Sequence, residues 1–171
     1  MPKTLLTDIA VSKITQAAGT NSQVAITHVA LGDGNGANYD PQFSQTALKR
    51  ERTRKAIERR HIIDPNVWRV NAEFGPDTDA FAVREIGFFD GQGNLIAIWA
   101  GLDVQARETG VITYLVDHVL SFSRIEDGVV IVDAPDDELY ALALSTGVAI
   151  TQMQMEQLRQ ADRIRAEHGA Y

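Results

Sequence analysis

The sequence predicts an α+β fold: an antiparallel β-sheet domain with an N-terminal amphipathic helix and C-terminal helices. Short runs rich in β-branched and aromatic residues recur through the middle of the chain, and residues typical of turns separate them. Helical periodicity is concentrated towards the two ends. Strands joined by short turns, with helices mainly at the ends, are typical of an antiparallel sheet in an α+β domain.

Composition limits the classes of function. With 171 residues, 44% of them hydrophobic, the chain is long enough to bury one core. The absence of cysteine excludes disulfides and thiolate metal sites. No run approaches the roughly 20 apolar residues that span a bilayer, so we expect no membrane partner. A net charge of −7 argues against nucleic acid as the main partner.

The N-terminal part of the chain predicts one helix and one strand. Thr7 is a suitable N-cap, apolar residues then recur at helical spacing through Ala18, and Gly19 stands where a helix commonly ends. The spacing therefore predicts an amphipathic helix over 7–18. A strand is predicted over 24–31.

The glycine-rich segment 31–36 allows several interpretations. A dinucleotide-binding loop needs another glycine spacing and a helix directly afterwards, and a phosphate-binding loop needs a Gly-Lys-Ser/Thr ending. Asp33 and Asn35 resemble the start of a calcium loop, but the residues that follow do not continue it. We expect a structural turn or an interface loop, with no cofactor and no metal.

Charge is concentrated in segment 49–61, where seven Lys or Arg against two Glu give a net charge of +5. Local propensity favours a helix here, although a strand ending in Ile62 and Ile63 is an alternative. Arg52, Arg54 and Arg59 are candidate interface residues. The alternative function is a nucleic-acid-binding module using 49–61, but no aromatic residue is interleaved for base stacking.

The central feature is a predicted β-hairpin over 83–99, with its turn at 90–94. Gly87 interrupts the first strand and indicates a bulge or a close approach of another part of the chain. Alternating apolar residues predict a half-buried strand over 67–74, and another strand is predicted over 111–122. Segment 129–132 is apolar at every position and is predicted to be buried on both faces.

The C-terminal part predicts a short helix over 139–145, ended by Gly147, and a second helix over 151–168. Its apolar positions, which include the candidate interface residues Leu158 and Ile164, do not form a regular heptad. We favour a helix packed on its own domain slightly over the start of a trimeric shaft.

Catalysis is not expected. Asp33, Asp40, Glu85 and His118 could be assembled into an acid–base pair, but no spacing in the sequence requires it. We expect a protein that is not an enzyme and that takes no small-molecule substrate.

The motifs of this chain, taken together and in their order, resemble the N-terminal domain of phage tail fibres. This domain defines the phage tail-collar fibre protein family, and the resemblance covers roughly residues 3–135. The resemblance includes Leu6-Thr7, the segment 31–36, Pro41, segment 45–48 and Arg52. Its most specific parts are 84–90 and 93–97. The structural motif residues are Gly32, Asp33, Gly34, Gly36, Arg84, Glu85, Gly87, Asp90 and Gly93.

The resemblance implies a structural protein of the virion tail, assembled in the cytoplasm of the bacterial host. In such a protein, residues 1–133 would form an α+β domain that joins a fibre to the baseplate or tail tip, and residues 134–171 a helical extension. The implied partners are baseplate or tail-tip proteins and further copies of the chain, because fibres of this family are trimers along their shafts. The extension is short, so we expect any trimer to be weak.

Overall fold

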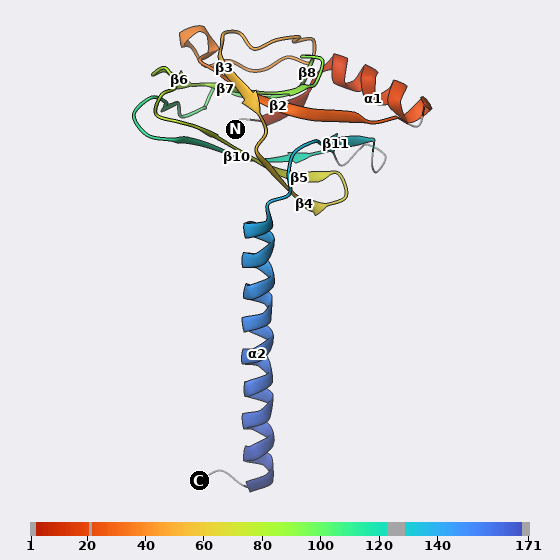
Figure 1. The fold of residues 1–171 in the computed structure, drawn as a ribbon, viewed down its shortest axis with the longest axis vertical. Helices are drawn as coiled ribbons and strands as arrows, with labels where there is room; N and C mark the ends of the chain where they lie inside the picture. Colours follow the sequence, from red (N-terminus) through yellow and green to blue (C-terminus); the bar gives the residue numbers. More distant parts are fainter. Residues whose placement is uncertain (1–2, 21, 123–128, 169–171) are drawn as a thin grey trace. The chain divides into compact units, whose positions relative to one another are not determined.

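A computed structural model describes residues 3–20, 22–122 and 129–168 (Figure 1). Contacts divide the chain into two units, residues 1–136 and residues 137–171. The first unit contains the described strands and the helix α1, and the second contains the helix α2. Each unit is described by itself, and together they confirm the predicted α+β class.

A six-stranded sheet forms the centre of the first unit. Its strand order is β1 (Lys3–Leu6), β8 (Leu95–Ala100), β7 (Glu85–Asp90), β2 (Val24–Gly32) and β11 (Val130–Val132), and β3 (Glu51–Ala56) also pairs with β2. The pairings are antiparallel except that of β11, which runs parallel to β2. The sheet is therefore mixed at one edge.

The predicted hairpin is confirmed as β7 and β8. Within its turn Gly93 has a φ of 84°, a conformation that glycine adopts without steric strain. The pairing register shifts between Phe88 and Phe89, so the bulge lies just beyond Gly87. All six residues of β7 are buried, as expected for a central strand with both faces covered.

A second sheet has the antiparallel order β10 (Tyr114–Ser121), β5 (Val67–Phe74) and β4 (Arg59–Asp64). The predicted alternation in β5 is confirmed, since every second residue from Trp68 to Phe74 is buried. Two short strands, β6 (Ala82–Val83) and β9 (Arg107–Glu108), form a further pair. Inner residues of β5 and β10 share one core cluster with the six-stranded sheet, so the two sheets pack against each other.

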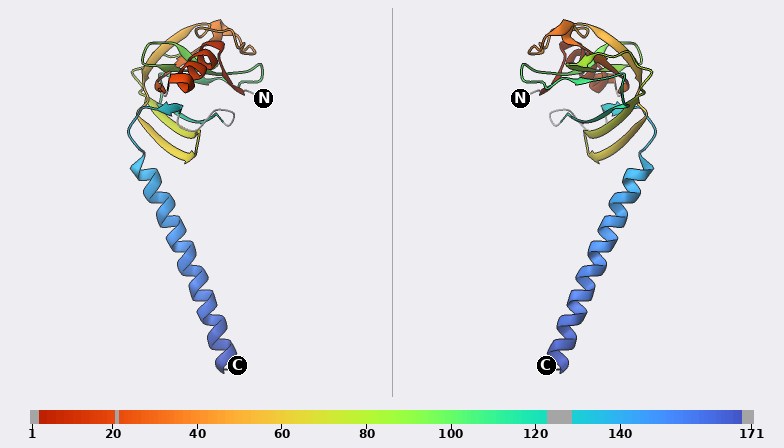
Figure 2. Two further views of the ribbon diagram at one scale, coloured as in Figure 1. Left: turned by 90° about the vertical axis from the view of Figure 1, so that its right-hand side faces the viewer. Right: turned by 90° about the vertical axis from the view of Figure 1, so that its left-hand side faces the viewer.

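Helix α1 (Asp8–Thr20) packs on the six-stranded sheet (Figure 2). The side chain of Thr7 caps it, because the hydroxyl accepts a hydrogen bond from Ala10 N at 3.2 Å. The same hydroxyl donates to Leu95 O at 2.6 Å and thereby ties the helix start to β8. The helix ends at Thr20, two residues beyond the predicted last residue, Ala18.

The predicted helix over 49–61 is wrong, and the alternative of a strand is correct. The segment forms β3 and β4, joined at Ile57 and Glu58. β3 pairs with β2 and β4 pairs with β5, so tertiary pairing overrides the local helix propensity of a charged sequence.

Two other strand predictions need correction. The strand predicted over 111–122 begins only at Tyr114, because Gly110 has a φ of 88° and Val111 and Ile112 follow in a bend, exposed to solvent. In segment 129–132, Ile131 is only partly buried, although its neighbours are buried.

The second unit is one continuous helix, α2 (Glu138–His168), and the prediction of two helices is wrong. Asp137 caps it through a hydrogen bond from Tyr140 N to Asp137 Oδ1, at 3.1 Å. Gly147 lies inside the helix, where a single glycine costs only about 1 kcal/mol relative to alanine, and the segments 141–144 and 152–158 on either side are rich in strong helix formers. Packing of this helix on the first unit stays a prediction.

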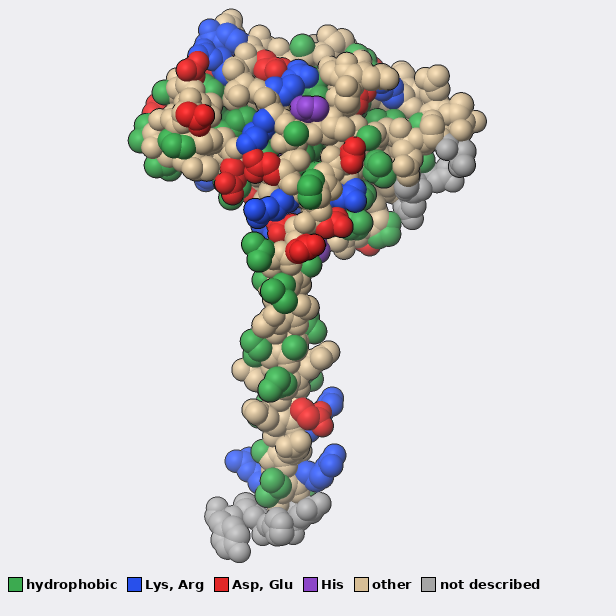
Figure 3. Space-filling view, in the orientation of Figure 1, with side chains coloured by type: hydrophobic (Ala, Val, Ile, Leu, Met, Phe, Trp, Pro, Cys, Tyr) green, Lys and Arg blue, Asp and Glu red, His purple; other side chains and the backbone are tan. Residues whose placement is uncertain are grey.

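Side-chain chemistry changes along α2. Large hydrophobic side chains are exposed along its first half, and the charged side chains gather in the second half, as Figure 3 shows. Within the described residues, no helix is long and apolar enough to cross a membrane.

Candidate attachment site

Glu85 occupies the centre of the site. It begins β7, and its side chain is fully buried at 0% exposure. Its Oε1 accepts hydrogen bonds from the backbone N–H groups of Gly34 at 3.1 Å and Arg50 at 2.9 Å. Its Oε2 accepts from Lys49 N at 2.9 Å and from the Tyr39 hydroxyl. These five residues form the Glu85 cluster, which satisfies a buried carboxylate with four donors.

Glycines make room for this cluster. A Cβ at Gly32 would lie 2.5 Å from Glu85 Oε1 and 2.7 Å from Arg50 O, which is too close for any other residue. Gly34 and Gly36 have φ values of 62° and 83°. The glycines of the motif therefore provide a tight turn and a close approach between chain segments.

Asp33 adds an ion pair beside the cluster. One carboxylate oxygen accepts from Asn35 N at 3.0 Å and starts a short 3₁₀ helix, η1 (Gly34–Gly36). The Arg50 guanidinium donates to both carboxylate oxygens, and Arg52 Nη1 lies 3.4 Å from Oδ2. The hydrogen bond from Arg50 holds the pKa of Asp33 below its usual value.

Residues 34–49 form a long irregular loop, which we call the Glu85 loop. Its two ends meet at Glu85, because Gly34 N and Lys49 N both donate to that carboxylate. Two of its side chains, Tyr39 and Leu48, point into a second core cluster and are 7% exposed each. Burial and the hydrogen bond to Glu85 raise the pKa of Tyr39 far above its usual value, so the hydroxyl stays protonated and donates. The loop is thus held by these two side chains in the core as well as by the hydrogen bonds at its ends.

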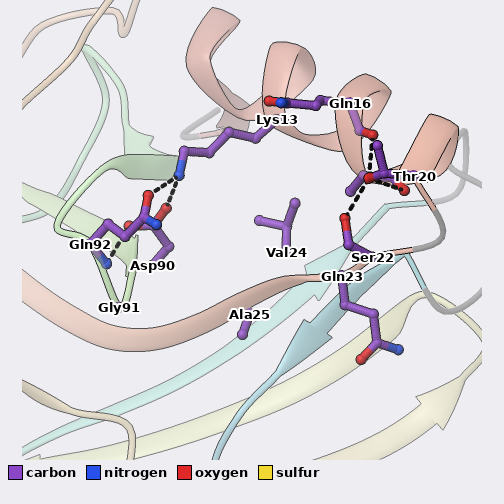
Figure 4. A pocket seen from close by; sticks show the side chains of 11 residues that line it. Lys13, Gln16, Thr20, Ser22, Gln23, Val24, Ala25, Asp90, Gly91 and Gln92 are labelled. Atoms are coloured by element: carbon purple, nitrogen blue, oxygen red, sulfur yellow. Dashed lines mark hydrogen bonds and ion pairs between the residues drawn. The ribbon is translucent and has the colours of Figure 1, made fainter.

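The hairpin turn has its own carboxylate. Asp90 Oδ1 accepts from Gln92 N at 2.9 Å and from Asn94 N at 2.8 Å, and Lys13 of α1 lies 2.8 Å from Oδ2. Burial raises the pKa of Asp90, but the hydrogen bonds from Lys13 and Asn94 outweigh it and leave the pKa lowered. Figure 4 shows Lys13 reaching across a cavity of about 340 Å³ towards this turn. Asp90 and Lys13 bind each other, and Asp90 also accepts from the turn backbone, so both charged groups at this cavity have structural partners.

The basic segment is neutralised largely by the chain's own carboxylates. Besides the pairs with Asp33, the structure shows Arg54 paired with Glu51, Lys55 with Glu58, and Arg60 with Asp136. Five cations of the segment also lie over aromatic rings: Lys49 over Tyr39, Arg52 over Phe81, Arg54 over Phe89, Lys55 over Phe74, and Arg60 over Trp68. These rings are buried, so they are not available for base stacking.

The three candidate arginines do not form one group. Arg52 and Arg54 lie on β3 of the six-stranded sheet, whereas Arg59 lies on β4 of the three-stranded sheet. Leu158 and Ile164 lie on α2 and are 67% and 59% exposed. Six residues apart, at about 100° per residue, they point about 120° apart around the helix and cannot share one narrow stripe.

We expect duplex DNA to bind the full chain no more tightly than a dissociation constant of about 10 μM in 150 mM salt, because most cations already have a carboxylate partner. Fluorescence anisotropy with a labelled duplex measures this. Nanomolar binding that the combined change Arg52→Gln, Arg54→Gln and Arg59→Gln abolishes would support the nucleic-acid alternative instead.

His118 of β10 links the two sheets. Its Nε2 lies 2.7 Å from Thr4 Oγ1 of β1, and its ring centroid lies 5.1 Å from that of Phe88. Burial lowers the pKa of His118 to about 4, and nearby Asp117 opposes this only in part. The imidazole is therefore neutral at pH 7. It borders a cavity of about 420 Å³ between β10 and the neighbouring strands and loop.

Stability is expected to fall as the pH drops from about 6.5 towards 4. In that window the unfolded chain binds a proton at His118 and the folded chain does not, so acid favours unfolding. The loss should reach on the order of 1–3 kcal/mol. Urea denaturation at pH 7 and pH 5 measures it for the parent and for His118→Gln, which can keep a hydrogen bond but does not titrate. Equal pH dependence in both proteins would contradict this role.

The four residues considered for acid–base catalysis have different environments. Glu85 and Asp33 hold the Glu85 loop, and Asp40 is exposed. The described contacts of His118 are with Thr4, Phe88 and Trp99 rather than with any of these three carboxylates. Among the described residues, no three His, Asp or Glu side chains lie close enough together to hold a metal ion.

The profile of the phage tail-collar fibre protein family, N-terminal part, matches residues 1–109, which is more than half of the chain. The chain belongs to this family. The matched residues include β7, β8 and the Glu85 loop, so the resemblance read from the motifs is confirmed.

A probable tail fibre protein of Escherichia phage P2 is 33% identical to this chain over 99 residues. The match covers 56% of this chain but only 15% of the relative, so the chain corresponds to a small part of that protein's length. No solved structure gives a significant match. The family and the relative together place the chain among structural components of phage tails.

Sequence reasoning missed several members of the site. Tyr39 was not identified, nor were the backbone donors of Lys49 and Arg50, which act through N–H groups that every residue but proline has. Asn38, whose Nδ2 donates to Leu102 O at 3.1 Å and Val104 O at 2.8 Å, was missed as well. Tyr39 lies between Gly36 and Pro41, and a tyrosine buried at such a place usually has a hydrogen-bond partner for its hydroxyl, which was the available signal.

Proposed function

We propose that this chain is the attachment part of a phage or prophage tail fibre. The first unit joins the fibre to the baseplate or tail tip through protein–protein contacts, and its role is structural rather than catalytic. Membership of the tail-collar fibre family is the observation that carries this proposal. The proposed location is the tail of the virion, after assembly in the cytoplasm of the host.

The construction of the site supports an attachment role. The Glu85 cluster keeps a long irregular loop in one conformation by means of a buried, fully paired carboxylate. Ordering such a loop costs conformational entropy, and long ordered loops without regular structure are commonly binding surfaces. A module that holds a fibre under load needs such a fixed surface.

Helix α2 supports self-association. Its apolar side chains form two stripes on nearly opposite sides of the helix. One stripe contains Leu139, Leu142, Ile150, Met153 and Ile164, and the other contains Leu144, Val148, Met155 and Leu158. All of these side chains are exposed on the helix itself. Exposed apolar side chains of this extent suit burial against further copies of the helix, and in a closed trimer one of the two stripes would face the three-fold axis.

We expect the full chain to form trimers that dissociate on dilution, because a 31-residue helix offers little area to offset the entropy of association. Leu158→Gln combined with Ile164→Gln, one residue from each stripe, should shift the population towards monomer, whereas Arg163→Gln should not. Analytical ultracentrifugation over a concentration series measures this. A monomer at every concentration would contradict the trimer, and a stable dimer would indicate another assembly.

Deletion of the gene tests the attachment function. We expect particles made without this chain to have tails that lack fibres, and a plasmid copy of the gene to restore the fibres. Negative-stain electron microscopy counts fibres per tail in both preparations. Particles with a full set of fibres in the absence of the chain would contradict the proposal.

A further inference from the structure

Phe43 is unusual among the aromatic residues of this chain. It is 62% exposed and is the most exposed aromatic residue within the part of the chain that the structure describes. It lies near the middle of the Glu85 loop, between the buried side chains of Tyr39 and Leu48. An exposed aromatic ring carries much of the binding energy when a protein partner covers it.

The backbone around Phe43 is fixed. Its carbonyl oxygen accepts a hydrogen bond from Asp8 N, at the start of α1, at 2.8 Å. Gln42 N donates to Gln45 Oε1 at 2.8 Å, and Gln45 Nε2 lies 3.3 Å from the Tyr39 hydroxyl that binds Glu85. The ring is therefore presented by a preorganised loop, so a partner would not need to order the loop on binding.

Lys49 provides a second unusual group in the same loop. Its ammonium lies 3.7 Å above the centre of the Tyr39 ring, and the structure shows no carboxylate paired with it among the described residues. The neighbouring cations Arg50, Arg52 and Arg54 do have such partners. Tyr39 contacts both Lys49 and Gln45, and Gln45 Oε1 accepts from Gln42 N, so contacts within the loop connect the unpaired charge to the segment that carries the exposed ring.

Resting on the attachment function proposed above, we infer that the Glu85 loop is the surface that docks on another tail protein. The Phe43 ring enters an apolar pocket of that protein, and a carboxylate at the rim of the pocket pairs with Lys49. A second copy of this chain related by a two-fold axis does not suit this surface. A two-fold contact centred on the loop would bring the two unpaired lysines together, and like charges in an interface are unfavourable.

Binding to tails assembled without this chain tests the inference. The probe is the fluorescently labelled full chain, and co-sedimentation with purified fibreless tails gives its dissociation constant. We expect Phe43→Ala to weaken binding at least tenfold and Lys49→Gln to weaken it and to reduce its dependence on salt. Val111→Ala, which shortens a 77% exposed side chain outside the loop, serves as the matched control and should bind like the parent.

The outcomes separate the inference from the proposed function. If the parent does not bind the tails, both fail. If the parent binds and Phe43→Ala binds equally well with unchanged thermal stability, only the docking surface is wrong. Photo-cross-linking through Phe43→p-benzoylphenylalanine gives a second readout. A cross-link to a tail protein supports the inference, and a cross-link to another copy of this chain, or none from bound protein, overturns it.

Discussion

Replacing Glu85 with alanine is expected to lower the free energy of unfolding by on the order of 3–5 kcal/mol. The change leaves the N–H groups of Gly34, Lys49 and Arg50 and the hydroxyl of Tyr39 without their acceptor in a buried site. The Glu85 loop should also open. Urea denaturation measures the free energy, and hydrogen exchange at Lys49 and Arg50 reports on the loop.

Glu51→Ala is the matched control for this change. Glu51 is an exposed partner of Arg54, and such a surface ion pair contributes about 1 kcal/mol or less. If Glu85→Ala unfolds at the same urea concentration as Glu51→Ala, the buried carboxylate does not hold the loop, and the account of the site fails.

Gly87→Val is expected to lower the free energy of unfolding by on the order of 1–3 kcal/mol. A Cβ at this position would lie 2.7 Å from Phe89 Cε2, 3.0 Å from Leu48 Cδ2 and 3.1 Å from Leu95 Cδ1. Because these atoms belong to the buried cluster beneath the Glu85 loop, they have little room to move. Thermal denaturation followed by circular dichroism measures the effect.

Gly91→Ala tests whether any glycine change in this hairpin would do the same. A Cβ at Gly91 meets nothing closer than 4.0 Å, and its φ lies outside the left-handed region. We expect this variant to melt close to the parent. A Gly87→Val protein that also melts with the parent would remove any special role from that position.

The sequence predicts the hairpin, the strand β5 and the start of α1 well, because each rests on a local signal. Alternation fixes which face of β5 is buried, and Thr7 supplies the cap that starts α1. The glycines 32, 34 and 36 were recognised as turn residues from their type alone. For Gly34 and Gly36 this holds, since both have positive φ values. The reason for Gly32 is the close approach of Glu85 and Arg50, which depends on chain segments far apart in the sequence.

Segment 49–61 is an example in which the local signal predicts the wrong secondary structure. Its charged residues favour a helix in isolation, yet the segment has two sheets to pair with and five aromatic rings to cover. Local propensity differs by only a few tenths of a kcal/mol per residue, whereas pairing satisfies a backbone hydrogen bond at every second position. The continuity of α2 through Gly147 has a similar cause, since one glycine is outweighed by the strong helix formers of 141–144 before it and of 152–158 after it.

The central claim is that the first unit attaches a fibre to the tail by protein contacts. Electron cryo-microscopy of purified particles tests it most directly, because it shows where residues 1–136 lie and what covers them. We expect density for the two packed sheets at the base of each fibre, with the Glu85 loop against a baseplate or tail-tip protein. Tails that carry fibres but show no density for this unit at their base would contradict the claim.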